Sequence, residues 1–236
     1  MDNIVLSRKL EPIAGDKASF QSIVMLTAFD LMLVIAGAFI SWYNSAMFLP
    51  YMIPLCFLAL GIGIFTSFYP KSANITGPTY AILEGVVIGV VSLSLEIIYP
   101  RIVLDAVLCT FGIAASCAFL YGSGWIKVST KLKKTVFALT LGVAFMYLID
   151  LGMLFATGTS LPLLHDNSPK GILVSFIICI IATLRLIVDY DMVKEAVDKG
   201  VSSEYDAYYA FGLTVTLIWL YLEVLRLLSK SRGSKK

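Results

Sequence analysis

The chain has 236 residues, of which 58% are hydrophobic and only 14% are charged. A soluble globular domain usually carries about 25% charged residues, so this composition indicates that lipid is the main solvent. The formal net charge of +2 is too small to indicate a nucleic-acid partner.

Seven apolar runs each approach the roughly 20 residues that a helix needs to span a bilayer. They cover residues 22–42, 50–68, 79–98, 102–121, 135–156, 171–191 and 208–228. Backbone polar groups must be hydrogen-bonded internally in lipid, which favours helices over irregular chain. Prolines lie at the run borders (Pro50, Pro70, Pro78, Pro100, Pro162 and Pro169), and Pro54 lies one turn inside the second run. We therefore predict an all-α integral membrane protein, with a cytoplasmic N-terminal tail over 1–21, a seven-helix domain over 22–229 and a basic C-terminal tail over 230–236.

Lysines and arginines in the connections predict the orientation in the membrane. With a cytoplasmic N-terminus, ten fall inside: Arg8, Lys9, Lys17, Lys71, Lys127, Lys131, Lys133, Lys134, Lys194 and Lys199. Apart from the C-terminal tail, only Arg101 and Lys170 fall outside. Seven crossings would also place four tail cations outside, namely Lys230, Arg232, Lys235 and Lys236. That conflict leaves two alternatives, an exceptional tail with seven crossings, which we favour, or a re-entrant last run.

Small residues in the third run predict a close helix contact. In "EGVVIGVVS", Gly85 and Gly89 form a GxxxG step and Ser92 extends the same face. Small residues at this spacing let two helices approach closely, so we expect a packing seam within the bundle. The fifth run repeats the pattern with Ala138 and Gly142.

Cysteines lie only within apolar runs, at Cys56, Cys109, Cys117 and Cys179. Their spacing matches neither a metal site nor an extracellular disulfide framework, so we predict free, packed thiols and no bound cofactor.

Ionisable side chains are rare and costly within spans, where a central charge costs roughly 2.5–3.5 kcal/mol on insertion scales. Nine lie within or at the ends of the runs: Asp30, Glu84, Asp105, Asp150, Arg185, Asp189, Asp191, Glu223 and Arg226. Asp105 and Asp191 are near helix ends, where we expect solvent contact. The remaining acids indicate an ion path or a proton relay, with buried structural ion pairs as the alternative.

Two of these acids have a base on the same helix face. Arg185 and Asp189 are four residues apart, and Glu223 and Arg226 are three apart. Burial, the helix C-terminus and a neighbouring acid oppose the charge of Asp189, whereas Arg185 supports it, so this carboxyl is the expected proton switch. Glu84, at the start of the third helix, is a candidate partner for either arginine.

Four segments resemble the Bax inhibitor-1 (TMBIM) family, in its bacterial, YccA-like branch. They are "YAILEGVVIGVVSLSLE", "YPRIVLDAVLCTF", "YGSGWIKVSTKL" and "YDAYYAFGLTVTLIWLYLEVLRLL", of which the last is the most specific. The resemblance covers nearly all of the chain after the N-terminal tail. It implies a seven-helix bundle with the last helix near the centre, in a multi-pass protein of the cell membrane. It also implies a pH-sensitive calcium leak.

The family's two acids, on the sixth and seventh helices, match Asp189 and Glu223 here, and both would contact calcium transiently. The second is Glu rather than Asp, so its reach differs by one methylene. The connection from Lys194 to Tyr209 is long, and helix arithmetic places the two acids at different depths. They would meet if the seventh span began later, which an interfacial helix over 194–208 would allow.

Two other functional classes remain as alternatives. An intramembrane aspartyl protease would share the acid of "DYD", but its second motif, GxGD, has no counterpart at Gly212 to Thr214. The single histidine, His165, lies beside Asp166 in an expected loop, so serine protease chemistry is also disfavoured and we expect no enzyme. The stronger alternative is a stress-response regulator without transport, which binds a membrane protease or other partner through its charged tail and the loop 127–134.

Overall fold

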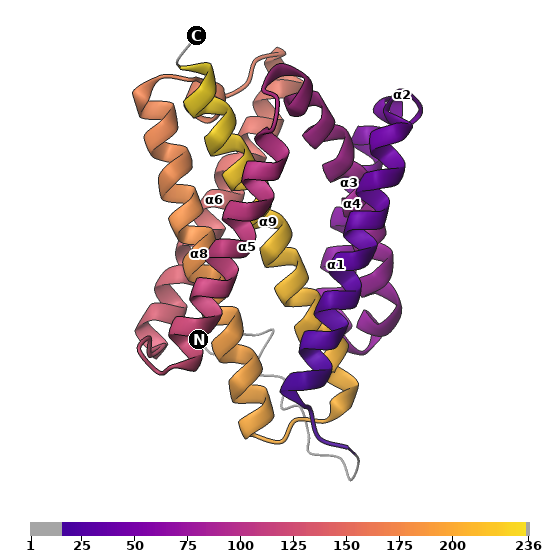
Figure 1. The fold of residues 1–236 in the computed structure, drawn as a ribbon, viewed down its shortest axis with the longest axis vertical. Coiled ribbons are helices and arrows are strands. Elements are labelled where there is room, and N and C mark those ends of the chain that lie inside the picture. Colours follow the sequence, from indigo (N-terminus) through magenta and orange to yellow (C-terminus); the bar gives the residue numbers. More distant parts are fainter. Residues whose placement is uncertain (1–15, 235–236) are drawn as a thin grey trace. The chain divides into compact units, whose positions relative to one another are not determined.

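A computed structural model describes residues 16–234, which are helical almost throughout (Figure 1). The elements in chain order are α1 (Phe20–Tyr43), α2 (Ser45–Phe48), η1 (Leu49–Tyr51), α3 (Met52–Phe68), η2 (Pro70–Ser72), α4 (Ala73–Ile98), α5 (Ile102–Gly122), α6 (Thr130–Thr157), α7 (Pro162–His165), α8 (Pro169–Asp198), η3 (Ser203–Tyr205) and α9 (Asp206–Gly233). Seven helical segments in this range are long and apolar enough to cross a membrane. The predicted all-α, seven-span architecture is confirmed.

Large apolar side chains on the outward faces of the spans agree with a lipid environment. Phe39 of α1, Phe145 of α6 and Phe155 of α6 are each about 60% exposed in the isolated chain. Such exposure would be costly in water, since burying an aromatic side chain of this size is worth roughly 1.5–3 kcal/mol. Lipid tails therefore complete the packing of these helices.

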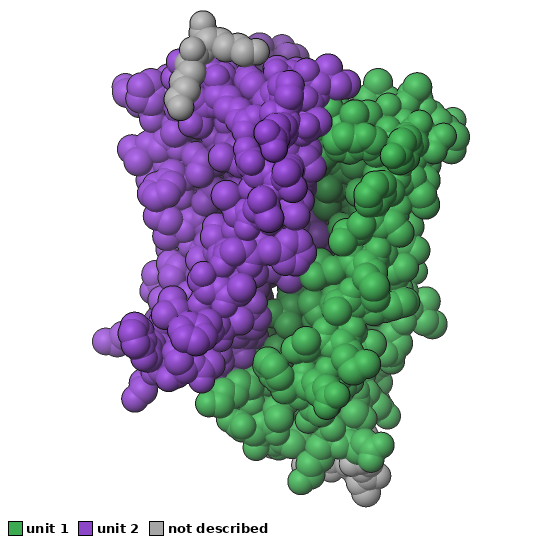
Figure 2. Space-filling model, in the orientation of Figure 1, with its two compact units in different colours: residues 1–94, 192–215 green, residues 95–191, 216–236 purple. Residues whose placement is uncertain are grey.

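The chain divides into two compact units, which Figure 2 colours separately. Unit 1 comprises residues 1–94 and 192–215, and unit 2 comprises residues 95–191 and 216–236. The helices α8 and α9 each contribute residues to both. The predicted N-terminal tail lies outside the described residues as far as residue 15.

Helices α1 and α4 of unit 1 meet along the predicted glycine seam. A Cβ atom at Gly85 would overlap the carbonyl of Val34, and one at Gly89 would overlap the carbonyl of Ala38. From the other side, a Cβ atom at Gly37 would lie 2.5 Å from the Ile82 carbonyl oxygen. Only glycine allows so close an approach of two backbones, so the expectation for the third run is confirmed.

The corresponding expectation for the fifth run is wrong. Ala138 and Gly142 are exposed, and a Cβ atom at Gly142 would have nothing within 4 Å. Spacing of small residues shows that they share a helix face, but it does not show which face meets another helix.

The start of helix α4 differs from the sequence-based expectation. Helix α4 begins at Ala73, so Pro78 lies inside it rather than at its border. Because Pro78 is in the second turn, its missing N–H removes a single hydrogen bond close to the helix start.

Helix α8 continues to Asp198, well beyond its apolar run, and an ion pair of 2.6 Å between Glu195 and Lys199 supports its last turn. Gly200, with a positive φ of 63°, follows that turn. The connection between α8 and α9 is therefore shorter than the predicted one from Lys194 to Tyr209, and the interfacial helix over 194–208 that would have let the two acids meet is not a separate element.

Unit 2 packs α5, α6 and α7 with residues 169–191 of α8 and 216–233 of α9. Its core joins Val143 of α6 with Ile178 and Ile181 of α8, and the partly buried rings of Tyr147 and Trp219 pack against it. These two aromatic residues carry polar atoms, so the core places hydrogen-bond donors inside the unit.

The last turns of α9 bind two of the four C-terminal cations to the rest of unit 2. Lys230 is buried, and its Nζ atom donates to the Gly171 carbonyl at 3.1 Å and to the Ser175 hydroxyl at 2.8 Å. Arg232 forms an ion pair with Asp105 and donates to the Pro100 carbonyl at 2.8 Å. Both cations are thus bound within unit 2 rather than free in a tail, and α9 is one unbroken helix of 28 residues. Lys235 and Lys236 lie outside the described residues.

Candidate functional site

Asp189 of α8 is buried in unit 2 with both of its carboxylate oxygens engaged. Its side chain is 6% exposed. Oδ1 lies 2.8 Å from Nη2 of Arg185, one turn earlier on the same helix. Oδ2 accepts a hydrogen bond of 2.6 Å from the Thr216 hydroxyl on α9. The predicted pair of Arg185 and Asp189 is confirmed, and the carboxylate also links two helices.

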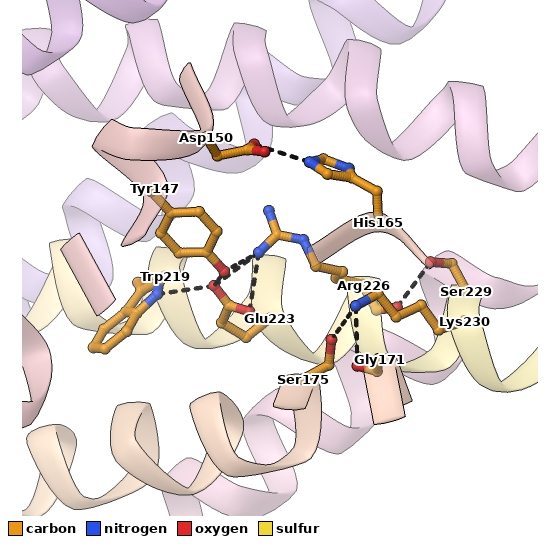
Figure 3. A network of polar contacts seen from close by, with 10 residues as sticks. All are labelled: Tyr147, Asp150, His165, Gly171, Ser175, Trp219, Glu223, Arg226, Ser229 and Lys230. Atoms are coloured by element: carbon orange, nitrogen blue, oxygen red, sulfur yellow. Dashed lines mark hydrogen bonds and ion pairs between the residues drawn. The ribbon is translucent and has the colours of Figure 1, made fainter. Parts of the chain in front are cut away.

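Glu223 of α9 lies at the centre of a second polar network in unit 2 (Figure 3). Its Oε1 atom accepts hydrogen bonds from the Tyr147 hydroxyl at 2.7 Å and from Nε1 of Trp219 at 3.1 Å. Nη1 of Arg226 lies 3.2 Å from Oε2, which confirms the second predicted pair. The Arg226 guanidinium also donates to the Tyr147 hydroxyl and lies 4.8 Å from the centroid of its ring.

The two acids occupy separate networks, since their described partners do not overlap. Thr216, which binds Asp189, and Glu223 are seven residues apart on α9. Seven residues are two helical turns, or about 10 Å along one face of a helix. The structure thus places Glu223 and Thr216, the α9 partner of Asp189, on a common face of α9 two turns apart, and each acid has its own arginine.

Sequence reasoning missed three residues of these networks, Thr216, Tyr147 and Trp219. The sequence pattern indicated them only weakly, because each side chain carries a single polar atom and lies in an apolar run. The i,i+4 and i,i+3 spacings identify bases on the same helix, but hydrogen-bond donors from other helices depend on the tertiary packing.

Two further acids of unit 2, Asp150 and Asp191, have basic partners. Asp150 of α6 accepts from the Leu161 backbone N–H at 2.6 Å, and its Oδ2 lies 2.9 Å from Nε2 of His165. Asp191, expected in solvent, instead forms an ion pair of 2.6 Å with Lys133 and accepts from the Tyr121 hydroxyl. Its side chain is only 19% exposed, because α6 begins at Thr130, earlier than expected, and brings Lys133 to it.

Asp105 of α5 agrees better with the sequence-based expectation. Its side chain is 46% exposed at the first turn of the helix, and its partner is Arg232.

The acids of unit 1 differ in their surroundings. Glu84 of α4 has Tyr80 of the same helix as its hydrogen-bond partner, and its pairing with an arginine remains a prediction. Asp30 of α1 is buried, with Thr214 of α9 facing it.

The four cysteines are free thiols, as predicted, but the prediction that they are packed is wrong for Cys56 and Cys109, which are exposed, and holds for Cys117 and Cys179. Among residues 16–234, no group of three His, Cys, Asp or Glu side chains is placed to hold a metal ion. Calcium contact with Asp189 and Glu223 therefore remains a proposal.

A family model described as Bax inhibitor 1 like matches residues 3–233, nearly the whole chain. The chain belongs to this family. No curated protein and no solved structure matches the chain significantly. The Bax inhibitor 1 like match spans the seven membrane-crossing segments and both polar networks, so the resemblance seen in the sequence is confirmed at the level of the family.

Proposed function

We propose that the protein is a pH-sensitive calcium leak, in which protonation of buried carboxylates opens a path for cations. The observation that carries this proposal is the environment of Asp189, a buried carboxylate that holds Arg185 with one oxygen and Thr216 with the other. A carboxylate so engaged is a latch between α8 and α9 rather than an open cation site.

Acidification is expected to release this latch. A hydrogen bond to an ionised acceptor is roughly twice as strong as a neutral one, so protonation of Asp189 weakens its bond with Thr216. Protonation also removes the countercharge of Arg185, whose side chain is only 27% exposed. Removing the charge of one partner in a buried ion pair typically costs about 3–5 kcal/mol. The weaker bond with Thr216 favours separation of the two helices at low pH, and the loss of the ion pair leaves Arg185 of α8 without its countercharge.

Glu223 is proposed as a second acid on the same path, two turns beyond Thr216 on α9. Calcium is a hard cation that prefers oxygen ligands, and carboxylates released from their arginines would supply them in passage. The family membership supports this proposal, as does the rarity of acids in spans without an ion-handling role.

The direct test measures calcium entry into liposomes that contain only the purified protein and a calcium dye, over a range of pH. Flux above that of protein-free liposomes, rising as pH falls, is expected. Asp166→Asn is the control, because the hydrogen bonds from Ser168 hold the pKa of this loop carboxyl below its usual range, so it stays ionised. Flux that is absent or independent of pH would contradict the leak.

A regulator without transport is the second candidate, and one surface favours it. Trp125 in the α5–α6 connection is 82% exposed, and Lys127, Lys131 and Lys134 beside it are exposed as well. This basic, aromatic segment fits an acidic partner such as a loop of a membrane protease. If the protein is such a regulator, the liposomes are expected to show no calcium flux. Substitution of the three lysines by glutamine is then expected to weaken the stress response of cells.

We also propose that the protein lies in a bacterial inner membrane with its N-terminus in the cytoplasm, as in the YccA-like branch. In a cysteine-free background, Ser129→Cys at the start of α6 is expected to resist a membrane-impermeant maleimide on intact cells and to react after lysis. Thr159→Cys, just past the other end of α6, is the matched control and is expected to react before lysis. Labelling of Ser129→Cys from outside would reverse the orientation.

A further inference from the structure

The buried acid Asp30 differs from the paired acids of unit 2, since no base is found among its described neighbours. It is 4% exposed and lies in the middle of α1. A Cβ atom at Gly77 of α4 would lie 3.6 Å from its Oδ2 atom and 3.8 Å from Cβ of Phe211. The carboxyl group is therefore enclosed by α4 and by the first part of α9, and the side chains described beside it carry no charge.

A second unpartnered polar group faces the same place. The Thr214 hydroxyl is directed at the Asp30 carboxyl, but the contact lacks the geometry of a full hydrogen bond. Thr214 is only 1% exposed, so its hydroxyl does not face bulk water as an alternative partner. Thr27, one turn before Asp30, cannot help, because its hydroxyl already donates to the Ile23 carbonyl at 2.8 Å.

A proton would satisfy both groups at once. An ionised carboxylate buried without a partner is so costly that such groups take up a proton and become neutral. The neutral acid has an O–H donor, which the Thr214 oxygen can accept. Calcium would need six to eight oxygen ligands, more than these two side chains supply.

Other titratable groups in the vicinity are already engaged or distant along their helices. Tyr80 of α4 packs its ring edge-on against Phe211, with centroids 5.2 Å apart, and its hydroxyl is bound to Glu84. Asp206 lies at the start of α9, two turns before Thr214.

We propose that Asp30 is a proton-binding site of unit 1, with the Thr214 hydroxyl as the acceptor of its proton. The site is of a different kind from Asp189, whose charge is held by an arginine. The proposal does not rest on the calcium leak, because protonation of Asp30 can be observed without any flux.

The test is infrared difference spectroscopy of the purified protein in liposomes, over a pH series from neutral to mildly acidic. Asp30→Asn is expected to remove one carbonyl band of a protonated carboxyl group, and Thr214→Val is expected to shift that band to higher frequency by removing its acceptor. Asp189→Asn is the matched control and should remove bands of an ionised carboxylate instead.

Loss of ionised carboxylate bands alone in Asp30→Asn, at every pH of the series, would overturn the proposal. A protonated band that Thr214→Val leaves in place would overturn the role of Thr214. If Asp30→Asn does not fold, the shift caused by Thr214→Val tests the same site in a chain that retains the acid, and the absence of a shift refutes it.

Discussion

Asp189→Asn is expected to conduct calcium at neutral pH as fast as the wild type does at acidic pH, with little further change on acidification. Asparagine resembles the protonated acid in shape but provides no charge for Arg185 and a weaker acceptor for Thr216. A hydrogen bond to a charged group contributes roughly 1.5–3 kcal/mol. Its loss would shift the balance between closed and open forms by about 10- to 100-fold, which calcium-dye liposomes can measure across pH.

Two further variants separate the latch from the acid itself. Thr216→Val removes the link to α9 but keeps Asp189 with Arg185, so flux at neutral pH should rise while part of the pH dependence remains. Glu223→Gln should flatten the pH dependence through the second network. Normal pH dependence in both Asp189→Asn and Glu223→Gln, in folded protein, would contradict the mechanism and favour the regulator.

Gly85→Ala is expected to cause a large loss of stability, although it adds only a single methyl group. The new methyl group would overlap the Val34 carbonyl of α1, and a backbone atom cannot move aside as a side chain can. Overpacking of a core typically costs about 1–3 kcal/mol and occasionally more. Thermal unfolding in detergent should show a clearly lower Tm or no folded protein.

Gly142→Ala is the matched control in α6, where the added methyl group meets nothing within 4 Å. Alanine is favoured over glycine in a helix by up to about 1 kcal/mol, so its Tm should stay the same or rise slightly. Equal losses at both positions would show that the effect does not arise from the α1–α4 contact.

Sequence patterns predicted the features of this fold that depend on neighbours along the chain. The seven spans, the pair of Arg185 and Asp189 and the pair of Glu223 and Arg226 are set by run length and by helical spacing. The glycine seam followed from local spacing too, but the same pattern was misleading at Gly142. Helical spacing shows which residues share a helix face, but it does not show which other helix that face contacts.

The partners from other helices could not be predicted in this way. Thr216 binds Asp189 across 27 residues, and Tyr147 binds Glu223 across 76. Such contacts depend on how far each helix extends and how the helices are staggered. The extended end of α8 and the early start of α6 were both missed, because charged residues outside the lipid can continue a helix without adding to its apolar run.

The pairing of Arg185 with Asp189 within one helix also has an electrical consequence. While the acid is ionised, the pair is neutral, and the transmembrane voltage exerts almost no net force on it. Once the acid takes up a proton, α8 carries an uncompensated positive charge inside the membrane. One elementary charge moved across the whole membrane gains or loses about 2.3 kcal/mol per 100 mV. Acidification would thus make this segment sensitive to voltage, so the membrane potential would influence the leak only after the acid had been neutralised.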